Sequence, residues 1–430
     1  MTDLTTSEYK EKVYLSLKKR NRAEARYKAY GIAAITFGLM CVFLLFFDIT
    51  SKGYKAFKIT YINLNVTYDE DILGVNDTSN ASQMALGDFD GVVKAGLRNR
   101  FTDVTGRKNK QELYSLISSG AGYTIRDQLK ETPSLLNSTV NLWLIADDDV
   151  DTYFKSLDDR NGPFRGRISE NKESWLNSLI ESGKVKTRFN SNFFSNGDSR
   201  EPELAGIRGA AMGSFYTLLI TIALAFPLGV AAAVYLEEFA LRNRWTNFIE
   251  VNINNLAAVP SIIFGLLGLA VFINFFGVPR SVPLVGGLVL TLMTLPTIII
   301  SSRAAIKSVP PSIREAAIGV GASPMQVVLH HVLPLAMPGM LTGAIIGMAR
   351  ALGETAPLLM IGMIAFIVDI PAGINDPATA LPVQIFLWAD SPERAFVEKT
   401  SAAIMILLAF LIIMNTVAVV LRNRLERRWM

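Results

Sequence analysis

An arginine and a glutamate lie four residues apart in the segment ARALGETAPLL (349–359), and the flanking segments MLTGAIIGM and MIGMIAFIV carry no charge. In a helix, residues at this spacing share a face, so Arg350 and Glu354 are predicted to lie side by side. A charge near the centre of a bilayer costs about 2.5–3.5 kcal/mol on insertion scales, so such residues face a bundle interior or a water-filled cavity. The pair therefore marks a polar pathway or, as the alternative, a salt bridge that only joins two helices.

The groups around this pair suit a tetrahedral oxyanion. The guanidinium group offers a fork of hydrogen-bond donors. Pro357 has no amide hydrogen, so the Gly353 carbonyl loses its helical partner and a bend is predicted there, beside Thr355. Broken backbone at membrane depth is tolerated where it lines a cavity or is buried in protein. Glu354 should repel an anion unless the anion carries a proton, as hydrogen phosphate does at neutral pH and sulfate does not. Phosphate is therefore the favoured hypothesis.

Prolines are predicted to interrupt three other apolar stretches and to let the helices rock: Pro227, Pro260 and Pro296. Ser261 follows one of these bends and is a further candidate for the pathway. Gly265 and Gly268 are predicted to serve close helix packing, which is a common use of small residues in membranes.

These residues need membrane-spanning elements to hold them. Half of the 430 residues are hydrophobic, and several apolar runs reach the roughly 20 residues that cross a bilayer. Six spans are predicted, at about 29–49, 209–235, 254–277, 284–302, 339–367 and 401–421. A long polar segment, 50–205, separates the first two, so the chain is predicted to be an α-helical membrane protein with one large inserted domain.

The net charge of +4 follows membrane topology and does not indicate nucleic-acid binding. Lys and Arg gather in the tail 1–28, near 242–244, in 303–314 and after the last span. The positive-inside rule therefore predicts cytoplasmic termini and an outer location for residues 50–205, and the basic tail also suits lipid head groups. The first span is predicted to be retained, since its apolar run is too long for a removable signal. One cysteine, Cys41, excludes an intrachain disulfide, and with two histidines it argues against a His/Cys metal site.

The inserted segment is predicted to fold as an α/β or α+β domain. FKITYINLNV (57–66) has the composition of a strand, and VNLWLIA (140–146) is apolar enough for a strand buried on both faces. Helices are predicted where Leu113, Leu116 and Ile117 recur at helical spacing, and in SWLNSLIESG (174–183).

An acidic run in this domain has partial calcium-loop spacing. Asp147, Asp149, Asp151 and Asp158 fall at EF-hand positions 1, 3, 5 and 12, but Thr152 stands where the loop requires glycine. A solvated acidic turn is therefore the preferred interpretation, and no metal site is predicted. The domain carries no catalytic constellation, and its role stays open.

The cytoplasmic loop 301–339 is predicted to form two short helices. Ser312, with Glu315 three residues later, has the spacing of a capping box. Gly321 permits a sharp turn, and Ser323 is placed to cap a second helix that begins at the following proline. The loop should therefore form a compact projection.

This projection resembles the EAA loop of ABC importer permeases, in Glu315-Ala316-Ala317, Gly321 and Leu333-Pro334. The resemblance implies docking into a groove on a separate cytoplasmic ATPase. Small alanines would permit close approach and Glu315 would supply a charge at the rim, whereas His331 departs from the isoleucine of the pattern. The alternative is an amphipathic hairpin that lies on the membrane. The chain has no G-x4-G-K-[ST] motif, so ATP and Mg²⁺ are expected on a partner and no cofactor on this chain.

The segment RALGETAPLL (350–359), together with VPSIIFGLLGL (259–269), is similar to the PstA-type phosphate permeases over roughly residues 205–430. The resemblance implies a type I ABC importer permease fold with six transmembrane helices, a permease core at 206–430, and a place for Arg350 and Glu354 in phosphate passage. It also implies the bacterial inner membrane, with 50–205 in the periplasm. The implied partners are a PstC-type second permease, a PstB-type ATPase dimer, a PstS-type phosphate-binding protein and a phosphate-sensing regulator. The long insertion departs from members that have a short connection.

Other hypotheses remain open. A permease for sulfate or molybdate would share the loop and the fold. A membrane-anchored phosphate-signalling scaffold would explain an outer domain and a basic tail. An intramembrane enzyme has the least support, because the spans contain no Ser/His, paired-Asp or metal constellation.

Overall fold

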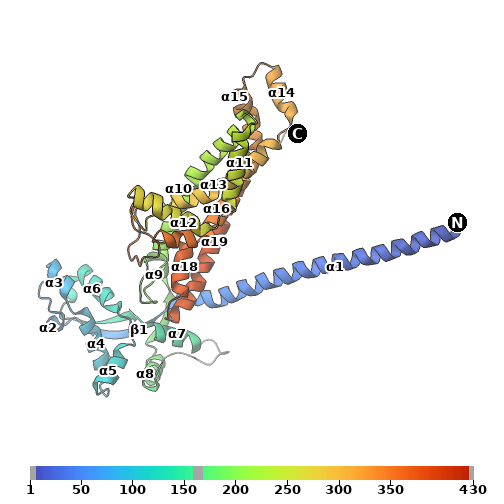
Figure 1. The fold of residues 1–430 in the computed structure, drawn as a ribbon. Coiled ribbons are helices and arrows are strands. Elements are labelled where there is room, and N and C mark those ends of the chain that lie inside the picture. The colour runs from blue at the N-terminus through green and yellow to red at the C-terminus, as the bar shows by residue number, and fades with distance from the viewer. Residues whose placement is uncertain (1–5, 158–167, 426–430) are drawn as a thin grey trace. The chain divides into compact units, whose positions relative to one another are not determined.

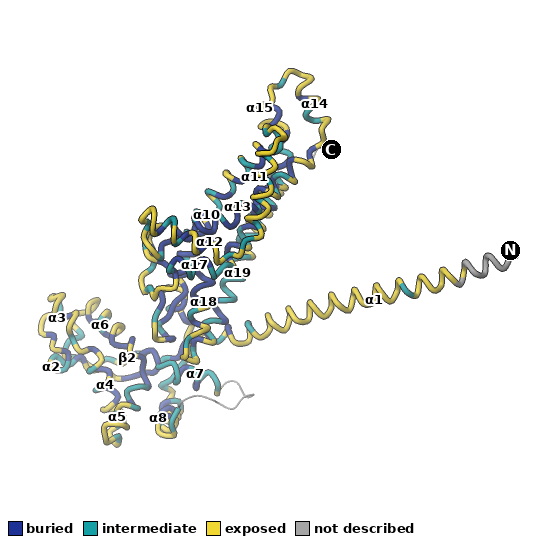
Figure 2. The backbone as a smooth tube through the Cα atoms, in the orientation of Figure 1, coloured by how far each residue is buried: buried dark blue, intermediate teal, exposed yellow. Residues whose placement is uncertain are grey.

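A computed structural model describes residues 6–157 and 168–425, and the chain forms two compact units, Met1–Lys52 and Gly53–Met430. The first unit consists of helix α1 (Thr6–Gly53), which runs without a break through the predicted span 29–49. Its apolar side chains in that window are exposed, as expected for a helix surrounded by lipid (Figure 2).

The inserted domain is built on a three-stranded antiparallel sheet with the order β2-β1-β3 (Figure 1). The strands are β1 (Lys58–Thr67), β2 (Thr139–Ile145) and β3 (Val185–Phe189). Helices α4 (Phe89–Arg100) and α6 (Ala121–Glu131) bury their apolar sides with one face of this sheet. The remaining elements are η1 (Tyr54–Phe57), α2 (Glu70–Leu73), α3 (Ala81–Leu86), α5 (Arg107–Tyr114), η2 (Pro133–Leu135), α7 (Asp148–Leu157), α8 (Glu170–Glu181) and α9 (Ser191–Ser195).

Both predicted strands exist, but the prediction that β2 is buried on both faces is wrong. Leu142 and Leu144 enter the core, whereas Trp143 lies on the other face with the Lys186 Nζ atom 3.4 Å from its ring centroid. The predicted helix near residue 113 is also shorter than its apolar spacing suggested. It ends at Tyr114, and Ile117 instead bridges Ala146.

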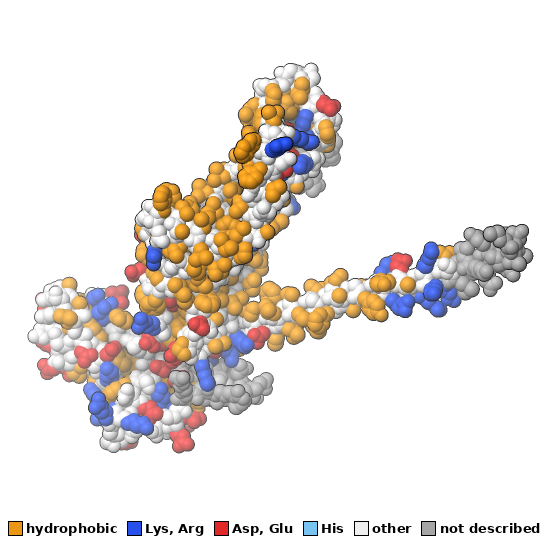
Figure 3. All heavy atoms as spheres, in the orientation of Figure 1, with side chains coloured by type: hydrophobic (Ala, Val, Ile, Leu, Met, Phe, Trp, Pro, Cys, Tyr) orange, Lys and Arg blue, Asp and Glu red, His pale blue; other side chains and the backbone are white. Residues whose placement is uncertain are grey.

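The second part of the same unit is a bundle of apolar helices. Its long members are α10 (Arg208–Val234), α13 (Pro283–Lys307), α16 (Leu333–Gly353) and α19 (Ala395–Leu425), of which α10, α13 and α16 pack against one another. Shorter elements connect them: η3 (Tyr235–Phe239), α11 (Arg244–Ala257), α12 (Ser261–Leu267), η4 (Gly268–Phe275), α14 (Pro311–Gly319), α15 (Pro324–Val327), η5 (Val328–Val332), α17 (Ala356–Met360) and α18 (Leu381–Ala389). Hydrophobic side chains dominate the visible surface of the bundle, and charged ones gather on the inserted domain (Figure 3).

Among the described residues, five helices are long and apolar enough to cross a membrane, or up to six if one bent pair counts as a span. The bent pair is α11 with α12–η4, which meet at 106° around Pro260, so the predicted third span is broken there. Pro227 and Pro296 lie inside helices that continue past them, so neither proline ends its helix. The predicted helix over 339–367 is also wrong, since α16 ends at Gly353.

Candidate functional site

Arg350 and Glu354 come together at the end of α16. The Arg350 Nε atom lies 3.5 Å from Glu354 Oε1, so the predicted adjacency exists. Glu354, however, is the residue that caps the helix, with extended backbone angles (φ −80°, ψ 122°). The Arg350 side chain is 46% exposed, while the next residues, Ala351 and Leu352, are buried. The guanidinium therefore faces away from the core of its own chain.

The backbone break lies before Pro357 and not at it. Thr355 is the N-cap of the short helix α17, in which Pro357 occupies the first turn. Proline at this position costs the helix no hydrogen bond, because the first four amides of a helix have no intrahelical acceptor. The predicted kink at Pro357 is therefore wrong. Helix α16 ends with Glu354 as its cap, and a new helix, α17, follows.

The two broken segments pack on each other. A Cβ atom on Gly265 of α12 would lie 2.7 Å from Pro357 Cα and 2.8 Å from its carbonyl oxygen, so only glycine permits this contact. A Cβ atom on Gly268 would lie 2.2 Å from a methyl carbon of Val289, which confirms the predicted packing role of both glycines. Ser261 begins α12 and is partly exposed.

The projection formed by residues 301–339 has a different construction from the predicted one. Helix α14 begins after Pro310 without a side-chain cap, so Ser312 is not a capping residue. Gly321 adopts φ +89° and makes the predicted turn, and the capping box lies instead at Ser323 and Gln326. The second helix is not short: it continues through η5 into α16 as one 30-residue helical segment, Pro324–Gly353.

A groove of about 400 Å³ lies between α14 and the start of this long helix. Ala316 and Pro334 line it, as do Val320, His330 and His331. Glu315 is exposed beside it, Leu333 is partly buried, and Ala317 is buried within the chain's own core. Of the predicted coupling residues, Ala316, Ala317 and Pro334 therefore line the groove, and Ala317 also packs α14 against the core.

An ion-pair network at this end of the bundle was not predicted. Glu238, in η3, lies 2.7 Å from Arg314 of α14, and Arg314 also donates hydrogen bonds to the Ile306 and Val309 carbonyls. Glu237 pairs with Arg303, whose Nη2 atom lies 2.8 Å from Glu250 of α11. The only sequence indication was the pair of acids that directly follows an apolar span in AAAVYLEEF.

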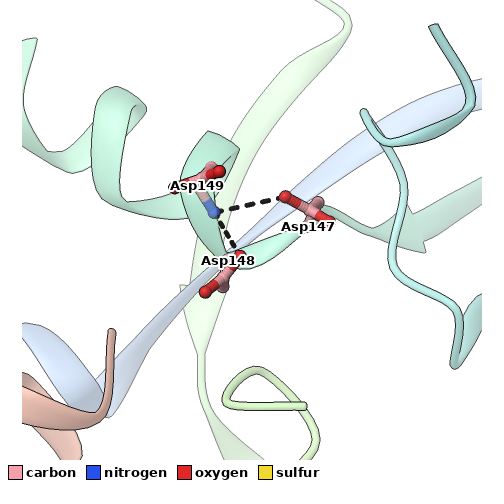
Figure 4. A group of neighbouring side chains, drawn as sticks. All are labelled: Asp147, Asp148 and Asp149. Carbon is pink, nitrogen blue, oxygen red and sulfur yellow. Dashed lines mark hydrogen bonds between the residues drawn. The ribbon is translucent and has the colours of Figure 1, made fainter. Parts of the chain in front are cut away.

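The acidic run of the inserted domain caps a helix and does not form a calcium loop (Figure 4). The Asp149 amide donates hydrogen bonds to the side chains of Asp147 (3.3 Å) and Asp148 (2.7 Å). Asp151 lies within α7, where it is buried, accepts a hydrogen bond from the Thr60 amide and pairs with Lys155 at 2.5 Å.

The interpretation as a solvated turn is therefore wrong. Burial, followed by the neighbouring carboxylates, raises the pKa of Asp147 to about 7. Oxygen atoms of Asp147, Asp148 and Asp149 lie within 4.8 Å of one another, and their hydrogen bonds to the start of α7 account for this arrangement. Asp158 lies outside the described residues.

Comparison with known proteins matches two family models. Residues 15–163 match a domain of unknown function, DUF3333, and residues 225–430 match the binding-protein-dependent transport system inner membrane component family. A probable ABC transporter permease, YqgI of Bacillus subtilis, is 39% identical over 36% of this chain and 52% of its own length. The phosphate transport system permease PstA 1 of Mycobacterium tuberculosis is 29% identical over 52% of this chain and 72% of its own.

Among solved structures, the MetNI methionine ABC transporter matches 50% of this chain and 95% of its own at 20% identity, with a TM-score of 0.41. The matched segments span about half to three quarters of the length of YqgI and PstA 1. These matches confirm the family that the sequence predicts. Through residues 225–430, the chain belongs to the binding-protein-dependent transport inner membrane component family as a PstA-type ABC permease.

Proposed function

We propose that this chain is one membrane-spanning subunit of an ATP-driven importer of inorganic phosphate. The main support is the position of Arg350. Its side chain is about half exposed, and it lies on a helix that is long and apolar enough to span a membrane. A charge facing lipid is costly, so a second permease subunit should cover this surface. The two subunits would then enclose a hydrated route with Arg350 and Glu354 on its wall, and Thr355 and Ser261 at the neighbouring helix ends.

Phosphate is the proposed substrate for two reasons. The PstA relative carries phosphate transport in its name. The pair also offers a cationic fork beside a carboxylate, and the hydroxyl of hydrogen phosphate can donate a hydrogen bond to that carboxylate, whereas sulfate has no proton to donate. Arg350 would bind the anion's oxygens, and Glu354 would select for the protonated one.

Energy would reach this route through the groove beside α14. An ATPase dimer that binds ATP and Mg²⁺ would insert a side chain between Ala316 and Pro334, and Glu315 would contact the rim. The ion pair between Arg314 and Glu238 supports this role, because it ties α14 to the end of α10. In this arrangement the termini lie in the cytoplasm, and residues 50–205 lie in the periplasm of a bacterial inner membrane, where a phosphate-binding protein delivers substrate.

Uptake of radiolabelled phosphate into cells that lack other phosphate importers tests the proposal. Arg350→Ala should lower the rate by about 100-fold or more, because the anion loses a charge-assisted donor pair in a poorly hydrated site. Glu354→Gln should lower the phosphate rate and weaken discrimination against sulfate. Arg280→Ala, an exposed loop change, serves as the control and should transport normally.

An Arg350→Ala variant with the wild-type rate would make the pair a structural ion pair only. If labelled sulfate or molybdate were transported in preference to phosphate, the substrate would be that oxyanion and not phosphate. Recovery of a histidine kinase and no ATPase with the purified chain would favour the signalling scaffold.

A further inference from the structure

The inserted domain contains a polar cavity of about 280 Å³ that is separate from the membrane helices. It lies where β3 stops pairing with β1, beside the C-terminal end of α4. Its polar lining includes Asn63, Asn65, Thr67, Asn99, Arg100 and Lys184.

Backbone donors are available along this edge. The last residue pair between β1 and β3 joins Ile62 to Val185, and the Asn63 amide then donates to the Lys184 carbonyl at 2.8 Å. Amides alternate between the two edges of a strand, so those of Asn65 and Thr67 point to the same side as that of Asn63. Beyond Asn63, no strand follows on that side in the part of the sheet that the structure describes.

The side chains add donors and positive charge. The Asn141 side-chain NH₂ group donates a hydrogen bond to Asn65 Oδ1 at 2.7 Å. This leaves the NH₂ group of Asn65 as a free donor. Arg100 makes one side-chain hydrogen bond, a 3.4 Å contact with Ser182 Oγ, which leaves most of its guanidinium donors open. Neither Arg100 nor Lys184 forms an ion pair with a described residue, and no Asp or Glu lines the cavity.

We propose that this cavity binds a phosphoryl group, as inorganic phosphate or as a small phosphate monoester. Two cations without carboxylate partners, amide donors from side chains and a free strand edge together complement an anion with several oxygens. The space exceeds one bare ion, so it admits a monoester or a phosphate with bound water. The site stands apart from Arg350 and does not depend on the function proposed for the membrane helices.

The test is equilibrium binding to the full chain in lipid nanodiscs, with radiolabelled inorganic phosphate as the first probe and glycerol 3-phosphate as the second. Hydrogen exchange then locates the bound ligand. Wild type should bind saturably, and exchange should slow at residues 63–67, 96–100 and 182–186. A monoester that binds more tightly than free phosphate would identify the ester as the ligand, and the reverse order would identify the free ion.

Paired variants test the assignment. Arg100→Gln with Lys184→Gln should weaken binding by about tenfold or more, because both charges are removed. Arg98→Gln with Lys186→Gln removes the same charge from α4 and from β3, two residues away from each cavity residue and outside the cavity lining, and should keep affinity within about twofold. Asn99→Asp, which adds a negative charge at nearly constant size, should also weaken binding and covers the case in which the first pair fails to fold.

Three results would overturn the proposal: unchanged phosphate binding in the Arg100/Lys184 pair, equal loss in the control pair, or protection from exchange only outside the named residues. Arg350→Ala separates the two sites, because it should abolish transport and leave the protection of residues 63–67 intact.

Discussion

Glu203 shows how a single buried carboxyl group can make the attachment of the inserted domain sensitive to pH. One of its oxygens accepts a hydrogen bond from Ser118, and the other has no hydrogen-bond partner among the described residues. Burial is the main reason that its pKa is raised to about 7, and the nearby Asp148 adds to the shift. The folded protein therefore holds a proton that the unfolded chain releases near pH 4.5.

Stability should consequently fall as pH rises from about 4.5 to 7, because the folded state binds more protons than the unfolded state in that window. The loss from Glu203 is at most about 3.5 kcal/mol, at about 1.4 kcal/mol for each pKa unit. The melting temperature in detergent should be higher at pH 5.5 than at pH 8. Glu203→Gln should reduce this difference, and an unchanged pH dependence would show that Glu203 is not its source.

The residue pairs also differ in how far the sequence could predict them. Arg350 and Glu354 are four positions apart, so their contact follows from local helical spacing and survives the helix end between them. Glu238 and Arg314 are 76 positions apart, and only the packing of α10 and η3 against α13 brings them together. No local pattern contains that information.

At the scale of elements, the ion pair between Arg314 and Glu238 links helix α14 to η3, which follows α10. Replacing Arg314 by Gln removes the charge and leaves two carbonyl acceptors and Glu238 without their donor. We expect transport-stimulated ATP hydrolysis by the assembled complex to fall by about tenfold, while basal hydrolysis on the partner persists. Glu238→Gln should act in the same direction but more weakly.

A double-mutant cycle provides the control for this prediction. If the two residues act through their contact, transport-stimulated ATP hydrolysis in the Arg314→Gln/Glu238→Gln variant should be no lower than in Arg314→Gln alone. Additive losses would mean that each residue acts independently.

The contact of α12 with α17 gives a second prediction at this scale. Gly265→Ala would place a Cβ atom 2.7 Å from the backbone of Pro357, which cannot move as a flexible side chain can. Overpacking of this kind costs about 1–3 kcal/mol, so the melting temperature and phosphate uptake should both fall. Gly31→Ala, in α1, meets no atom within 4 Å and should change neither. A Gly265→Ala protein with normal stability would show that the two broken segments can separate freely.

Apolar runs located the long helices because hydropathy is a local property, and both predicted strands exist for the same reason. The helix end at Glu354 was missed, since a proline in the first turn of a new helix and a proline that bends an old one have the same sequence. Strand β3 was missed because VKTRF is short and half charged, and it forms only where β1 offers it an edge.

At the scale of the whole chain, buried polar contacts join the inserted domain to the permease helices. Lys155 of α7 lies 2.5 Å from Asp151 and 3.5 Å from Glu398 of α19. The Trp388 indole of α18 donates to Asp198 at 2.9 Å. These contacts join elements far apart in the sequence, which is why the buried state of Asp151 could not be predicted.

Lys155→Met should loosen this junction, because it leaves two acids buried without their shared cation. Breaking a buried pair costs about 3–5 kcal/mol, so limited proteolysis should cleave between the domain and α10 much faster than in wild type. Lys94→Met, on an exposed position of α4, is the control and should not change the cleavage rate. Equal cleavage rates in the two variants would mean that other contacts suffice to hold the domain.

The 30-residue helical segment from Pro324 to Gly353 carries the groove residue His331 near its start and Arg350 near its end, about 28 Å apart at 1.5 Å per residue. A helix that continues without a break can carry a displacement along its axis from one end toward the other. A displacement of this helix at His331 therefore also moves the Arg350 guanidinium group without any relay of intermediate side chains, which is how the proposed ATPase contact would act on the proposed anion route.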